Sequence, residues 1–162
     1  MNNLQLFAMT IAALLTTDMA VKADDATVQT PLQAIESYVD AFNSGAVNDH
    51  IDAIYTFPLA WVIDGSVRIH QSPPPSIVSY ENLRQSGWAY SKANEIEVLS
   101  EGLNTSVVRL DFSRYTQDHQ EILRTEAFYA MINDGGNWKI ATITVPISLP
   151  VLADEDKEPN KR

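Results

Sequence analysis

Four charged residues on two neighbouring predicted strands have the types and spacing needed to bind a polar ligand: Arg109 and Asp111 on the first, Arg124 and Glu126 on the second. Because side chains alternate along a strand, each pair points to one face. Opposite charges then lie on the diagonals between the strands, within reach of long side chains. If this face lines a cavity, it forms a polar floor for an anionic or hydroxylated ligand. If it faces outward or toward a dimer partner, which we favour, it is an ion-pair lattice that contributes roughly 0–1 kcal/mol per pair.

The register of these two strands follows from the turn between them. A tight turn at residues 118–119 places Asp111 opposite Glu126 and Ser113 opposite Arg124. The opposite face of the first strand is apolar and carries Val108, Leu110 and Phe112.

Aromatic residues could line a pocket or fill a core: Tyr38, Tyr55, Phe57, Trp61, Trp88, Phe112, Tyr129 and Trp138. Core packing explains each of them without a ligand, since an α+β domain needs large apolar side chains inside. We take Tyr55, Trp61 and Tyr129 as candidate ligand-binding residues.

Composition excludes several classes of site and partner. The chain has no cysteine, so disulfides, thiolate metal sites and cysteine nucleophiles are absent. Its three histidines lie far apart in sequence without metal-ligand spacing, and we predict neither a metal nor a cofactor. The formal net charge of −10 repels phosphate backbones, which argues against nucleic-acid binding.

The elements that must position these residues are helices followed by strands. Thr30 and Pro31 predict the start of a first helix that runs to Asn43, and Gly45 predicts its end. A shorter helix is predicted from Val47 to about Tyr55, ended by the Phe-Pro pair at 57–58, and a third from Tyr80 to about Trp88. Period-two patterns and turn sequences predict strands at 60–63, 66–70, 93–100, 105–116, 122–133 and 137–145.

The 162 residues suffice for one domain, which we expect at 31–150. Residues 1–23 are expected to be a signal peptide, because residues 4–15 form an apolar run and Val21 and Ala23 suit a cleavage site. A buried or amphipathic N-terminal helix is the alternative. We expect a short linker at 24–30 and a disordered charged tail at 151–162. The mature protein would then be periplasmic or secreted, with no stable membrane span.

The order of these elements resembles the nuclear-transport-factor-two-like superfamily, and within it the SnoaL-like branch. The resemblance covers about residues 31–145 and rests on four stretches: LQAIESYVDAFN at 32–43, WVIDG at 61–65, YENL at 80–83 and DGGNWKI at 134–140. It implies a cone-shaped α+β fold, in which N-terminal helices pack on a curved antiparallel sheet around an apolar pocket. Members often form homodimers through the sheet.

The resemblance also implies candidate chemistry. Isomerases and cyclases of this superfamily use an aspartate or histidine as a proton shuttle in the pocket, and burial would suit such a group to the task. The nearest candidates are Asp64 and His70, on either side of the first hairpin. The alternatives are a turn role for Asp64, which precedes a glycine, and a solvated strand end for His70.

Three functions remain open from the sequence, because fold does not fix function. The first is an exported SnoaL-like domain that binds a small apolar or hydroxylated molecule without catalysis. The second is a proton-transfer enzyme, an isomerase, cyclase or dehydratase, that uses Asp64 or His70 with Tyr55 or Tyr129 as a hydrogen-bond donor. The third is a structural or protein-interaction domain that uses the outer sheet face.

Overall fold

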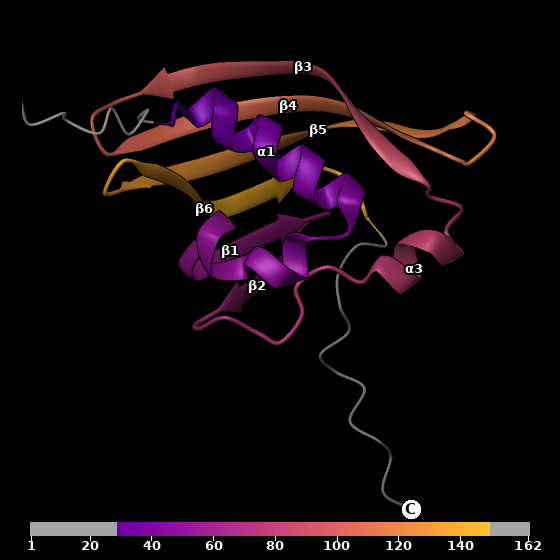
Figure 1. Cartoon of the computed structure of the whole chain (residues 1–162), viewed down its shortest axis with the longest axis horizontal. Coiled ribbons are helices and arrows are strands. Elements are labelled where there is room, and N and C mark those ends of the chain that lie inside the picture. The colour runs from indigo at the N-terminus through magenta and orange to yellow at the C-terminus, as the bar shows by residue number, and fades with distance from the viewer. Residues whose placement is uncertain (1–28, 150–162) are drawn as a thin grey trace, which may run out of the picture.

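The computed structural model describes residues 29–149, in which helices pack on one face of a six-stranded curved sheet (Figure 1). The strand order is β2-β1-β6-β5-β4-β3. In chain order the elements are α1 (Pro31–Ser44), η1 (Val47–His50), α2 (Ile51–Ile54), β1 (Tyr55–Ile63), β2 (Ser66–His70), α3 (Tyr80–Gln85), β3 (Tyr90–Glu101), β4 (Thr105–Tyr115), β5 (Glu121–Asp134) and β6 (Asn137–Val145). The predicted α+β cone fold is confirmed.

Helix α1 begins and ends where its capping residues predict. The Thr30 side chain accepts a hydrogen bond from the Gln33 backbone N–H, and the Gln33 side chain accepts one from Thr30 N–H. At the other end, Gly45 has a φ of 81°, which is a left-handed backbone conformation. Glycine adopts it with little steric strain because it has no Cβ. The helix buries Ile35, Tyr38 and Phe42 against the inner face of the sheet.

The second helical segment, predicted from Val47 to about Tyr55, is confirmed to within one residue, but the strand that follows begins earlier than the predicted Ala60. A turn of 3₁₀ helix and the single turn of α2 end at Ile54, and Tyr55 already belongs to β1, where it pairs with Ile140 of β6. Tyr55 is fully buried, so strand pairing and core packing outweigh the local helical pattern. Pro58, which was expected to end the helix, lies inside β1 where the register with β6 shifts.

The sheet is mixed, which corrects the expectation of a wholly antiparallel one. β3, β4, β5 and β6 form the predicted antiparallel meander, and β1 and β2 the predicted hairpin. β1, however, pairs in parallel with β6, so the first hairpin extends the far edge of the sheet. The predicted register is confirmed: Asp111 lies opposite Glu126, and Ser113 opposite Arg124.

Several expectations concern residues beyond this description. The signal peptide at 1–23, most of the linker at 24–30 and the tail at 151–162 lie outside the described residues. Within residues 29–149, none of the helices is long and apolar enough to span a membrane. The same range holds no cluster of three or more potential metal ligands.

Candidate functional site

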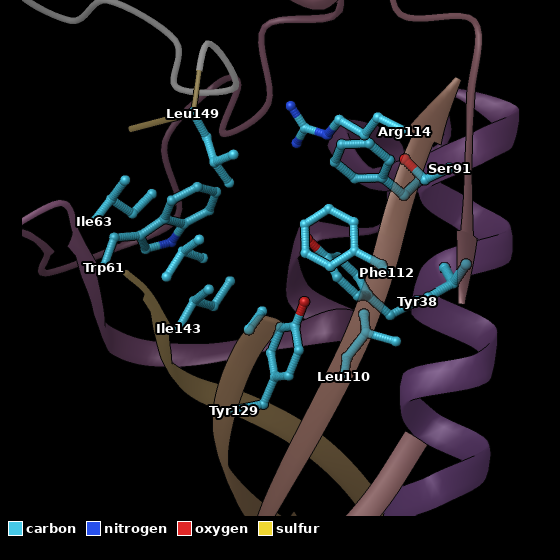
Figure 2. A pocket seen from close by; sticks show the side chains of 14 residues that line it. Tyr38, Trp61, Ile63, Ser91, Leu110, Phe112, Arg114, Tyr129, Ile143 and Leu149 are labelled. Carbon is cyan, nitrogen blue, oxygen red and sulfur yellow. The ribbon is translucent and has the colours of Figure 1, made fainter. Parts of the chain in front are cut away.

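A largely apolar cavity lies between α1 and the inner face of the sheet (Figure 2). The hollow measures about 550 Å³ counting its open mouth, of which about 50 Å³ admits the centre of a water molecule. That inner space has room for a few water molecules. The residues that line it are Tyr38, Val39, Phe42, Trp61, Ile63, Ser91, Leu110, Phe112, Arg114, Ala127, Tyr129, Ile143, Val145 and Leu149.

Strand alternation places these side chains. Leu110, Phe112 and Arg114 point inward from β4, and Ala127 and Tyr129 point inward from β5. Helix α1 closes the cavity from the other side with Tyr38 and Phe42, which lie one turn apart.

Arg114 is the only charged residue among those lining the cavity within the described range. It is 4% exposed, and its guanidinium carbon lies 5.8 Å from the ring centroids of both Phe42 and Phe112. Its Nε is buried without a hydrogen-bond partner among residues 29–149. Burial lowers the pKa of Arg114 to about 10, so the side chain still carries its charge at neutral pH. A buried charge without an ionic partner is costly to a fold, which suggests that this one serves binding.

Two tyrosine hydroxyls share the cavity with Arg114. The Tyr129 hydroxyl points into the hollow from β5 (Figure 2). The Tyr38 ring lies edge-on to the Tyr129 ring, and the two ring centroids are 5.8 Å apart. Burial raises the pKa of both phenols. The nearby Tyr55 hydroxyl and then the charge of Arg114 oppose the rise at Tyr38, and Arg114 opposes it at Tyr129, without cancelling it. Both hydroxyls therefore stay protonated at neutral pH and can donate hydrogen bonds.

The predicted aromatic candidates separate into two groups. Trp61 and Tyr129 line the cavity. Tyr55 does not: it is 1% exposed and lies behind Tyr38, with ring centroids 6.1 Å apart. Its hydroxyl and the Trp61 Nε1 are buried without hydrogen-bond partners in the described part of the chain.

The four-charge cluster lies on the other face of the sheet. Arg109 donates to Glu126 at 2.6 Å, and also pairs with Glu95 and Glu97 of β3. Arg124 pairs with Asp111 at 2.8 Å. None of these residues is among those lining the cavity. The geometry thus matches the outward lattice rather than a polar floor, because odd-numbered positions of β4 point away from α1.

The two catalytic candidates also lie outside the cavity lining. Asp64 is exposed in the β1–β2 turn with a φ of 48°, a conformation that aspartate tolerates better than most residues. His70 is buried at the end of β2 rather than solvated. Their catalytic roles stay predictions.

Sequence reasoning missed Arg114, although the signal was present. Alternation along β4 assigns Val108, Leu110 and Phe112 to the apolar face, and Arg114 is the next position on that face. A cation that continues an apolar series is the pattern that would have identified it.

Comparisons with known proteins point to one family and fold. The family model described as NTF2-like protein (DUF6841) matches residues 32–146. No functionally curated protein matches the sequence significantly.

Solved structures share the fold at low sequence identity. A Shewanella frigidimarina protein provisionally assigned as a ketosteroid isomerase is 10% identical, with a TM-score of 0.55 over 74% of this chain and 97% of its own. A Novosphingobium aromaticivorans protein provisionally assigned as an aromatic ring hydroxylase is 12% identical, with a TM-score of 0.51 over 76% of this chain and 94% of its own. An NTF2-like protein from Cytophaga hutchinsonii is 11% identical, with a TM-score of 0.52 over 72% and 94%. At these sequence identities the structural similarity shows a shared fold alone.

Proposed function

We propose, since this chain belongs to the NTF2-like family DUF6841, that its cavity binds a small, mainly apolar molecule. The superfamily predicted from the sequence is confirmed, and the SnoaL-like branch stays a prediction. The observation that carries the proposal is the apolar hollow into which the Tyr129 hydroxyl points. A few oriented polar groups in a mainly apolar cavity are typical of small-molecule sites. The steroid and aromatic ring in the assigned names of two structural neighbours are of the same chemical kind.

Binding without catalysis is the function we favour over proton transfer. A proton shuttle works best when its pKa lies near the working pH, as a carboxylate or imidazole allows. The residues that line the cavity in the described range include neither. The proton-transfer alternative would have to draw on Asp64 or His70, which lie outside the lining.

The size of the cavity limits the ligand. About 50 Å³ of free space is smaller than one aromatic ring requires, so a ring would also take up part of the open hollow, whose lining includes Leu149 (Figure 2). We therefore propose a ligand with a single ring or a short branched chain.

A neutral one-ring probe tests this proposal. Binding of 4-fluorotoluene to the full chain can be followed by ¹⁹F NMR, with the variant Ala127→Leu as the critical comparison. Ala127 is 1% exposed and lines the cavity, so leucine would fill it. We expect its Kd to rise about tenfold or more, equivalent to about 1.4 kcal/mol of lost binding. The matched control is Ala130→Leu, on the outer face of the same strand, which should bind as wild type. No saturable binding to wild type, or equal affinity in both variants, would overturn the proposal.

We also propose that the chain is exported, which makes the mature protein periplasmic or secreted. The apolar run at 4–15 and the small residue at Ala23 support this. Mass spectrometry of the protein from an exporting host would measure the N-terminus, expected near Asp24, and an intact Met1 would contradict export. A homodimer through the outer sheet face stays a prediction that sedimentation can test.

A further inference from the structure

Arginines on the two faces of the sheet have opposite surroundings. On the outer face, Arg109 pairs with three carboxylates and Arg124 with one. On the inner face, no hydrogen bond or ion pair links the Arg114 side chain to any residue from 29 to 149. The chain has 21 acidic residues against 11 basic ones, so carboxylates are abundant. The fold nevertheless places none of the described ones against its buried arginine.

Aromatic contacts compensate Arg114 only in part. The rings of Phe42 and Phe112 lie 5.8 Å from its guanidinium carbon, and their faces attract the cation. A ring face does not replace an acceptor, however, because guanidinium has five N–H donors in a planar fork that matches a carboxylate. The buried Nε has no partner, and neither Nη group forms a hydrogen bond or ion pair with a described residue, so this capacity is not used within the described chain.

The other polar groups of the cavity are also suited to donate. The Tyr38 and Tyr129 hydroxyls are protonated at neutral pH, and burial raises the pKa of both further. The Ser91 hydroxyl accepts a hydrogen bond from Trp88 Nε1 at 2.9 Å, so its own proton remains available. A cavity with one cation, several O–H donors and no lining carboxylate among the described residues is electrostatically complementary to an anion.

We infer that the ligand is a monocarboxylate with an aromatic or branched aliphatic body, whose carboxylate pairs with Arg114 while its body lies against Phe112, Tyr129 and Trp61. The inference rests on the proposed function and specifies its ligand. A single arginine matches a single negative charge, whereas a phosphate dianion would bring a second, unpaired charge into an apolar site.

Three ¹⁹F probes of similar shape separate this inference from the proposed function. They are 4-fluorobenzoate, the neutral 4-fluorobenzamide and the apolar 4-fluorotoluene, titrated into the full chain. We expect 4-fluorobenzoate to bind at least about tenfold more tightly than 4-fluorobenzamide. If the neutral probes bind and the benzoate binds no better, this inference fails and the proposed function stands. If none of the three binds, both fail.

Substitution of the arginine gives the second comparison. Arg114→Met keeps the length and apolar contacts of the side chain, and it should weaken 4-fluorobenzoate at least about tenfold without weakening 4-fluorotoluene. Arg114→Lys should give an intermediate affinity, because it keeps the charge and loses the fork. The matched control is Lys92→Met, which removes an exposed cation from β3 and should not change binding. Unchanged benzoate affinity in a folded Arg114→Met protein would overturn the inference, and 4-fluorotoluene binding to that variant verifies its fold.

A further variant tests whether the chain's own tail supplies the carboxylate. Asp154, Glu155 and Asp156 follow the domain in sequence. A full-length chain with Asp154→Asn, Glu155→Gln and Asp156→Asn should bind 4-fluorobenzoate as wild type does. Binding that appears only in this variant would overturn the inference and assign Arg114 to the tail.

Discussion

At the residue scale, the buried tyrosines predict how stability changes with pH. Burial raises the pKa of Tyr55 well above its ordinary value, whereas in the unfolded chain it titrates near pH 10. Above about pH 10 the unfolded chain releases a proton that the folded chain keeps. The stability is therefore complete below that pH and falls above it, by about 1.4 kcal/mol per pH unit for each such tyrosine. Urea unfolding of Tyr55→Phe between pH 9 and 11 should show a shallower fall than wild type.

Two features make Tyr55→Phe a clean substitution. The substitution keeps the buried ring and removes only the hydroxyl, which lies close to the Tyr38 hydroxyl without meeting the geometry of a hydrogen bond. Arg114 acts in the opposite direction, since its pKa lowered to about 10 makes stability rise above that pH, but this contribution is the same in both proteins. A slope that does not change would contradict the prediction.

Individual residues differ in how far the sequence determines their role. Alternation correctly predicted Glu126 as a partner of Arg109 and Asp111 as the partner of Arg124, because register depends on one local turn, but it did not predict the pairs of Arg109 with β3. It would also have assigned Arg114 to the apolar face. The position of Tyr55 behind Tyr38 could not be predicted, because it depends on how β1 meets β6.

At the element scale, one side chain fixes the end of α1 to the sheet. Asn43 donates to the Ser91 carbonyl at 2.8 Å and accepts from the Ser91 backbone N–H at 2.7 Å. Asn43→Ala would leave both backbone groups unpaired, and we expect it to lower the free energy of unfolding by about 1–3 kcal/mol. It should also weaken 4-fluorobenzoate, because the adjacent Phe42 covers Arg114.

Urea unfolding and a ¹⁹F titration measure these two effects. The control is Ser44→Ala, whose hydroxyl bonds only to its own helix and whose loss should stay within about 0.5 kcal/mol. If Asn43→Ala and Ser44→Ala behave alike, the attachment has no role in stability.

Elements that depend on neighbours in sequence were predictable, and those that depend on distant strands were not. The caps of α1 and the β1–β2 turn are each determined by a few adjacent residues. The parallel pairing of β1 with β6 joins segments far apart in sequence, and no local pattern encodes it. The same pairing includes Tyr55, so β1 begins there rather than at the predicted Ala60. It also forms part of the cavity wall, where Trp61 lies beside Ile143.

At the scale of the whole molecule, the charge outside and the charge inside have opposite signs. The chain carries a formal net charge of −10, while the described lining of its cavity contains one buried arginine and no carboxylate. An anionic ligand is therefore repelled at long range and attracted at short range. The two effects differ in their response to salt, since ions screen exposed charges over about 10 Å at 0.1 M but screen buried pairs much less.

This difference predicts an unusual salt dependence for 4-fluorobenzoate. Raising the ionic strength from 10 to 300 mM should increase its association rate constant by about twofold or more, because it screens the repulsion from the acidic surface. The dissociation rate constant should change little, because the contact with Arg114 is buried. Line-shape analysis of the ¹⁹F titrations gives both constants, and 4-fluorobenzamide, which has no charge to repel, serves as the control. An association rate that falls with salt would mean that the field of Arg114 at the cavity mouth outweighs the net charge of the molecule.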